Sequence, residues 1–119
     1  LSLILNIFLF VGCSDNNSII AIAETEPVTT SGDAADDPAI VINYSNPKQS
    51  IILGTDKRAG VYSYDLSGKK ISYAALGEIN NIDVRQVDNK IYVAASNRTA
   101  KSIEFWEFNQ QEFFNNLLL

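Results

Sequence analysis

Three carboxylates crowd into one short stretch of the sequence, S-G-D-A-A-D-D-P-A-I, at residues 31–40. Asp33, Asp36 and Asp37 lie immediately before Pro38 and an apolar run. Like charges this close repel one another unless water, a cation or hydrogen-bond donors offset them. The spacing is not that of an EF-hand, because Gly is missing from the sixth position and Glu from the twelfth. Taken alone, the cluster predicts a solvated acidic turn.

The residues that carry much of the acid–base and nucleophilic chemistry of enzymes are nearly missing. The chain has no His and a single Cys, Cys13. This excludes, within the sequence, a His general base, a Cys–His nucleophile pair, a typical zinc site and a disulfide inside one copy. The net charge is −5, with six acids and no base through Pro47 and nine bases against eight acids after it. Such a distribution lacks a basic footprint, so we predict no nucleic-acid partner.

The beginning of the chain has the pattern of a secretion signal. Residues 1–12 are almost entirely apolar, a run too short to span a bilayer but typical of a signal-peptide core. The following F-V-G-C-S resembles a bacterial lipobox, in which the Cys, here Cys13, is acylated after cleavage. The alternative is a buried strand that ends in Gly-Cys. Because the chain starts with Leu and has no Met, we expect a fragment, with a truncated lipoprotein signal peptide over 1–13 and a polar tether over 14–30.

Seven short runs rich in apolar and β-branched residues follow, at intervals of about ten residues. Several alternate, as in V-Y-S-Y and I-E-F-W-E-F, and no segment sustains a helical period. We predict strands over residues 39–44, 50–55, 60–66, 70–76, 81–87, 90–96 and 102–108. This all-β antiparallel meander fits a sandwich, a barrel or the first blades of a propeller. The tail from Gln110 carries no turn or cap signal and predicts no element.

Four segments carry a more specific signal, in this order along the chain: E-T-E-P-V-T-T-S-G-D-A-A-D-D-P-A-I (24–40), G-T-D-K-R-A-G-V-Y-S-Y-D-L-S-G-K (54–69), N-N-I-D-V-R (80–85) and A-A-S-N-R (94–98). Together they resemble segments of the β-propeller phytase family. The resemblance implies that residues 31–119 are the N-terminal part of a six-bladed β-propeller, namely its first one to two blades. The remaining blades would then lie outside this chain.

The resemblance also assigns roles to charged residues. Asp36 matches a calcium ligand of the family, and Asp33 and Asp37 are further candidate ligands that could instead cap the turn. Lys57, in the turn D-K-R-A-G, and Arg98, at a strand end, match phosphate-binding residues. On sequence alone these two would be ordinary exposed hairpin charges. The motif residues Asn80, Asn81 and Asp83 are assigned a role in ordering a loop, and Arg58 is predicted to be a surface or packing residue.

The implied function is calcium-dependent hydrolysis of phosphomonoesters, with release of phosphate from phytate, the hexakisphosphate of inositol, by a metal-activated water. Calcium as cofactor would offset the repulsion between phytate and an acidic chain, and no protein nucleophile would be required. We expect phytate or other inositol phosphates as partners, a lipid anchor on Cys13, and a secreted lipoprotein of the outer membrane or cell surface.

Two alternatives remain at this point: a non-catalytic envelope lipoprotein propeller with structural calcium, and an inactive gene fragment. In every case we expect this fragment to be inactive by itself. Its candidate residues Asp36, Lys57 and Arg98 would supply one sector of a site whose other calcium ligands lie downstream.

Overall fold

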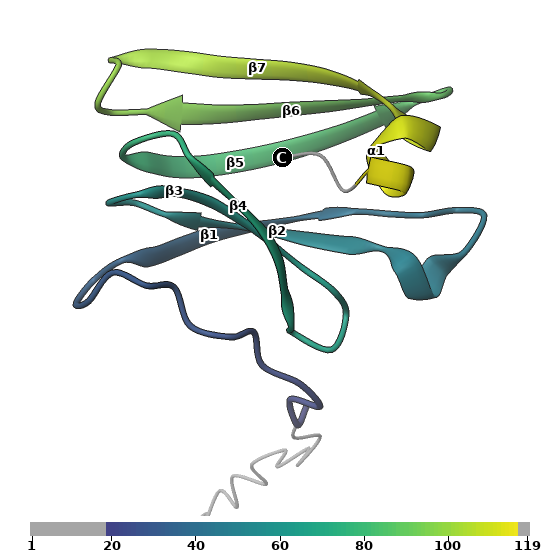
Figure 1. Ribbon diagram of the computed structural model, residues 1–119, viewed down its shortest axis with the longest axis horizontal. Coiled ribbons are helices and arrows are strands. Elements are labelled where there is room, and N and C mark those ends of the chain that lie inside the picture. Colours follow the sequence, from purple (N-terminus) through teal and green to yellow (C-terminus); the bar gives the residue numbers. More distant parts are fainter. Residues whose placement is uncertain (1–18, 117–119) are drawn as a thin grey trace, which may run out of the picture.

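The computed structural model describes residues 19–116. Two antiparallel sheets lie one above the other in the view of Figure 1. The first has the strand order β1-β2-β3-β4, with β1 at Ala35–Val41, β2 at Ile51–Asp56, β3 at Gly60–Tyr64 and β4 at Lys70–Ala75. The second has the order β5-β6-β7, with β5 at Ile79–Val87, β6 at Lys90–Asn97 and β7 at Ser102–Asn109. A 3-10 turn at Pro47–Gln49 lies between β1 and β2.

These strands confirm the predicted all-β class and the antiparallel meander. Within each sheet, consecutive strands pair with each other, so that Ile52 lies opposite Ile40 on one side and Tyr64 on the other. In the second sheet, Val93 lies opposite Val84 and Trp106. A four-stranded meander is the size of one propeller blade. The six-bladed arrangement stays a prediction.

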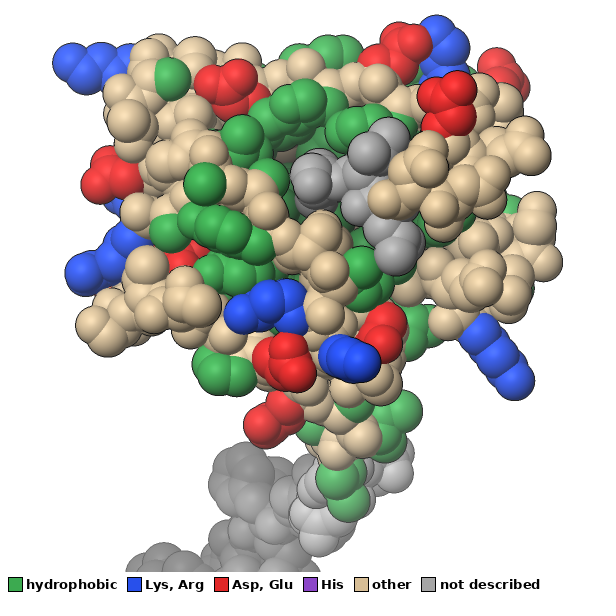
Figure 2. Space-filling view, in the orientation of Figure 1, with side chains coloured by type: hydrophobic (Ala, Val, Ile, Leu, Met, Phe, Trp, Pro, Cys, Tyr) green, Lys and Arg blue, Asp and Glu red, His purple; other side chains and the backbone are tan. Residues whose placement is uncertain are grey.

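Apolar side chains between the two sheets form one core. Alternation along the strands directs them there, as in β6, where Ile91, Val93 and Ala95 are buried and the residues between them are more exposed. The buried members of this core are Val41, Ile51, Leu53, Val61, Ile79, Ile82, Ile91, Val93, Ala95 and Phe113. Figure 2 shows apolar side chains in the area between the sheets, with acidic and basic side chains interspersed around them. The core therefore fixes how the ends of β1, β2, β5 and β6 lie relative to one another.

The first strand begins earlier than predicted, and this moves two of the three acids. We expected a strand from residue 39 with the acidic turn before it, but β1 already includes Asp36, Asp37 and Pro38. Pro is tolerated here because β1 is an edge strand and its pairing with β2 shifts register between Ala35 and Pro38. The prediction of an acidic turn was therefore wrong for Asp36 and Asp37, whose backbone lies in a strand.

The tail also differs from its prediction, because Gln110–Asn116 forms the helix α1. The side chain of Asn109 accepts hydrogen bonds from the backbone N–H groups of Gln111 and Glu112, at 2.9 and 3.3 Å. Phe113 is buried and packs edge-on against Phe108, with ring centroids 5.4 Å apart. Capping and burial thus support a helix that no periodic pattern indicated. No helix among residues 19–116 has the length and apolar character needed to cross a membrane.

The predictions for Cys13, for the signal peptide and for the first part of the tether lie outside the described residues. The later part of the tether segment contacts the first sheet. The N–H of Glu26 donates to the carbonyl of Gly68 at 2.8 Å, and the hydroxyls of Thr29 and Tyr62 are 2.7 Å apart. Gly68 has a φ of +86°, and a Cβ there would lie 1.9 Å from the carbonyl oxygen of Glu24. The close approach of the two backbones therefore requires glycine at this position.

Candidate functional site

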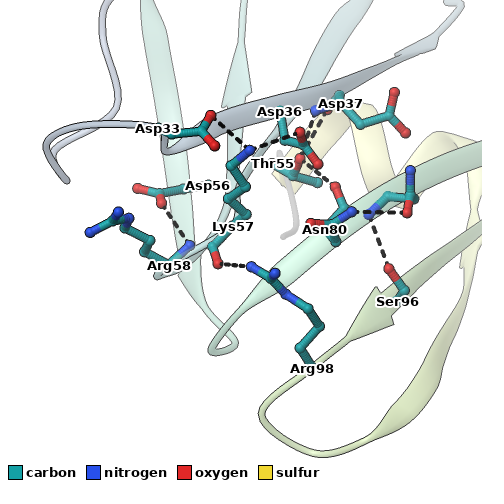
Figure 3. Close-up of polar contacts among 11 residues, drawn as sticks. Asp33, Asp36, Asp37, Thr55, Asp56, Lys57, Arg58, Asn80, Ser96 and Arg98 are labelled. Carbon is teal, nitrogen blue, oxygen red and sulfur yellow. Dashed lines mark hydrogen bonds and ion pairs between the residues drawn. The ribbon is translucent and has the colours of Figure 1, made fainter.

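Lys57 lies in the turn between β2 and β3, close to two of the carboxylates predicted to bind calcium. Its backbone N–H donates to the carbonyl of Ala34 at 2.9 Å, which joins the turn to the start of β1. Its ammonium Nζ lies 2.8 Å from Asp33 Oδ1 and 3.3 Å from Asp36 Oδ1. Figure 3 shows the ammonium between these two carboxylates. The structure thus brings together one predicted phosphate-binding residue and two predicted calcium ligands.

Each member of the Lys57–Asp33 pair stabilises the charged form of the other. The hydrogen bond from Lys57 and its positive charge hold the pKa of Asp33 below the ordinary value of 3.8. The hydrogen bond to Asp33 raises the pKa of Lys57 above the ordinary value of 10.5, with a further contribution from Asp36. Both groups are therefore charged throughout the neutral range. An incoming anion would have to compete with two carboxylates for this ammonium.

Arg98 reaches the same turn from the second sheet. It follows β6 directly, and its backbone N–H donates to the carbonyl of Glu78 at 2.9 Å. Its guanidinium Nη2 donates to the carbonyl of Lys57 at 2.8 Å, as Figure 3 shows. The preceding residue, Asn97, is buried, and its amide donates to the carbonyl of Leu76 at 2.9 Å. The end of β6 is thus held in place, and the two predicted phosphate-binding residues contact each other.

These residues line an open pocket of about 510 Å³. Its lining residues are Asp33, Lys57, Arg58, Glu78, Asn80 and Arg98. Three cationic side chains face two carboxylates there, so the pocket has mixed charge with a small positive excess. Such a pocket can bind an anion through charge-assisted hydrogen bonds, and the Arg guanidinium can hold two oxygens at once.

Two lining residues were not predicted as part of a site. Arg58 was predicted to be a surface or packing residue, and its place beside Lys57 in D-K-R-A-G was the available signal. Glu78 carried no signal, because it reaches the pocket through contacts with residues distant in sequence. Its N–H donates to the hydroxyl of Thr99 at 3.0 Å, and its carbonyl accepts the backbone N–H of Arg98 at 2.9 Å.

The carboxylate of Asp37 points away from Lys57 and has partners of its own (Figure 3). Its Oδ2 accepts a hydrogen bond from the N–H of Ile82 at 3.0 Å, and its own N–H donates to the hydroxyl of Thr55 at 2.9 Å. Figure 3 shows its carboxylate on the side away from Asp33. It lines a different open pocket, of about 630 Å³, together with Pro38, Ile82 and other residues of β5 and β6. The three predicted calcium ligands therefore do not meet at one point.

The donor set of the described residues fits part of a calcium shell. Asp33 and Asp36 already approach a single cation, the Lys57 ammonium, and carboxylate oxygens are the hard ligands that calcium prefers. Two carboxylates offer at most about four of the six to eight oxygens required. Within residues 19–116, no group of three or more Asp, Glu or Cys side chains gathers as a metal site.

The three residues that the resemblance assigns to ordering a loop, Asn80, Asn81 and Asp83, lie in β5. The amide of Asn80 donates to Asn81 Oδ1 at 3.1 Å, and the N–H of Asn81 donates to the hydroxyl of Ser96 at 3.0 Å. Asp83 Oδ1 accepts from the N–H of Val84 at 2.8 Å. Asn80 alone lines the pocket of Lys57 and Arg98, whereas Asn81 and Asp83 line the pocket of Asp37. These contacts place the motif between the two pockets.

The fold and the pocket define an all-β protein in which basic and acidic side chains lie close together at the ends of β2 and β6. The sequence model of the Phytase family matches residues 8–116, and the chain belongs to this family. Over 67 residues the chain is 42% identical to the 3-phytase of Bacillus subtilis (strain 168). This region covers 56% of the chain and 18% of the Bacillus protein, so the chain matches less than a fifth of that relative's length.

Proposed function

We propose that the full-length protein expected to contain this chain is a calcium-dependent phosphatase that releases phosphate from phytate. The observation that supports this most is the contact between Lys57 and Arg98, with Asp33 and Asp36 beside the Lys57 ammonium. The two candidate phosphate-binding residues thus line one pocket together with Asp33, and Asp36 contacts the Lys57 ammonium, in a chain of the Phytase family. A 3-phytase among the relatives supports the same substrate class.

In this proposal the chain's own residues bind and orient a phosphate group. The Arg98 guanidinium offers planar paired donors, and the Lys57 ammonium offers a compact point charge. Phosphate oxygens compete with Asp33 and Asp36 for Lys57, so substrate binding and carboxylate release are linked. Calcium, held in part by Asp36 and Asp33, would supply charge neutralisation and a lowered pKa of water. Further ligands from later blades of a six-bladed propeller complete the site, and the isolated chain is inactive.

Substitution of the two cations tests the assignment of substrate binding. In the full-length protein, we expect Lys57→Gln and Arg98→Gln each to lower kcat/KM for phytate by roughly 10- to 100-fold, because each removes one charge-assisted hydrogen bond. Arg85→Gln is a matched control, because Arg85 is exposed and its guanidinium lies as far as 3.9 Å from the carboxylate of Asp83. Phosphate release from phytate is the measurement. A kcat/KM for both variants equal to that of the control would contradict the assignment.

We also propose that the protein is a cell-envelope lipoprotein anchored through Cys13. The support is the lipobox-like sequence F-V-G-C-S after an apolar run, and several acyl chains give stable attachment where one does not. In cells that express the full-length protein, we expect it in the membrane fraction and the Cys13→Ala variant in the soluble fraction. Equal partition of the two forms between the fractions would rule out the anchor.

A further inference from the structure

The carboxylate of Asp56 is buried next to the two basic residues of the turn. Asp56 is the last residue of β2 and has a relative exposure of 0%. The hydroxyl of Thr30 lies 2.7 Å from each of its oxygens, and the N–H of Arg58 donates to Oδ1 at 3.0 Å. A buried carboxylate requires such donors, because an unpaired one carries a large desolvation cost. Asp56 therefore joins the N-terminal segment to the turn that follows β2.

The turn transmits this contact to both candidate phosphate-binding side chains. Asp56 also accepts the N–H of Ala59 through its own carbonyl at 3.0 Å, so its side chain and its backbone both fix the turn. The Lys57 ammonium extends from this turn to Asp33 and Asp36, and the Lys57 carbonyl accepts the Arg98 guanidinium at 2.8 Å. A shift of the turn would therefore displace both cations together.

We propose that Thr30 and Asp56 are positioning residues for phosphate binding. The Thr30 hydroxyl orients the Asp56 carboxylate, the carboxylate orients the turn, and the turn sets the Lys57 ammonium and the Arg98 guanidinium. Neither residue touches the substrate. The inference rests on the proposed function for the class of substrate and is independent of calcium. Thr30, the last residue of the predicted tether, would thus support the site.

Substitutions in the N-terminal segment of the full-length protein test this inference. Thr30→Val removes the hydroxyl and keeps the shape, and we expect it to raise KM for phytate by about three- to tenfold with a smaller change in kcat. Thr30→Ser keeps the hydroxyl, and we expect KM to return to within about twofold of wild type. Thr29→Val is the matched control. Its hydroxyl contacts Tyr62 and not Asp56, so it should lower Tm with KM changed less than about twofold.

A double-mutant cycle with Lys57→Gln separates positioning from a general loss of stability. If Thr30 acts through the turn, adding Thr30→Val to Lys57→Gln should raise KM by clearly less than it does in the wild-type background, because only the Arg98 guanidinium is then left to be displaced. An unchanged KM in Thr30→Val, or effects of the two substitutions that multiply, would overturn the inference. The Kd of phytate, measured by calorimetry on the same variants, should follow the same pattern. Because the Kd does not depend on catalysis, the variants can be compared even if the protein binds phytate without releasing phosphate. That outcome would contradict the proposed function and leave the positioning inference testable.

Discussion

Removal of calcium from the full-length protein is expected to lower phosphate release from phytate by at least about 100-fold. A catalytic metal contributes several kcal/mol to the stabilisation of developing charge, and each 1.36 kcal/mol corresponds to about tenfold in rate. The chain offers no His and no Cys in its described pocket that could replace this contribution. Excess chelator followed by return of calcium is the experiment, with phosphate release as the measurement.

The same experiment distinguishes a catalytic calcium from a structural one. We expect the far-UV circular dichroism and the Tm to change little at the chelator concentration that removes activity. Loss of activity only together with unfolding would instead favour a propeller with structural calcium. Full activity in excess chelator would contradict the proposed mechanism. Magnesium should restore less activity than calcium, because it demands near-octahedral geometry and gives up its water reluctantly.

Asp36→Asn tests the assignment of Asp36 as a calcium ligand. It removes one charge from the carboxylate pair at Lys57, so we expect a higher calcium concentration for half-maximal activity. Asp88→Asn is the matched control, because it makes the same chemical change in an exposed turn between β5 and β6. The φ of Asp88 is +52°, a conformation that Asn also adopts. An equal calcium requirement in the two variants would remove Asp36 from the proposed ligand set.

The strands could be predicted because their signals are local. Alternation, β-branched residues and turn residues recur within each run, so the six strands after the first lie within two residues of their predicted bounds. The start of β1 could not be predicted in this way. Pro38 argues against a strand in a local pattern, and only the edge position and the bulge beside it make the strand possible. The helix α1 was missed for a similar reason, since burial of Phe113 is a tertiary effect.

The site could be predicted only in part. The family resemblance assigned Lys57 and Arg98 to phosphate, and the structure places them in contact although they are 41 residues apart. The same resemblance grouped three acids that the fold separates, because Asp37 bonds to Ile82 of the other sheet. The supports Thr30 and Asp56 have no signature in sequence, since their roles depend on burial and on a contact across 26 residues.

Gly60 closes the turn that carries Lys57, and Gly60→Ala is expected to destabilise the fold by at least about 4 kcal/mol. Its φ is +150°, where other residues are strained by about 1–3 kcal/mol. A Cβ at this position would also lie 2.0 Å from the carbonyl oxygen of Ala74 and 2.9 Å from the backbone nitrogen of Leu76. Both atoms belong to the backbone at the end of β4, so a side-chain rotation cannot relieve the clash.

The neighbouring strands leave Gly60 little freedom to move. It pairs with Asp56 in β2 and with Ala75 in β4, so any shift breaks sheet hydrogen bonds or moves the turn between Asp56 and Gly60. A loss of about 4 kcal/mol is a large part of the 5–15 kcal/mol that typically stabilises a domain. Because the displaced turn carries Lys57, the protein that still folds should also bind phytate more weakly.

Urea-induced unfolding of the full-length protein measures the effect of Gly60→Ala on the free energy of unfolding. Gly32→Ala is the matched control, because Gly32 also has a positive φ, +78°, but a Cβ there would meet only the Arg58 guanidinium, at 3.6 Å. The control carries backbone strain without a backbone clash, so we expect it to cost about 1 kcal/mol. If Gly60→Ala lowered the free energy of unfolding no more than Gly32→Ala, the backbone between β3 and β4 could move to accept the side chain. The turn would then not hold Lys57 in a fixed position.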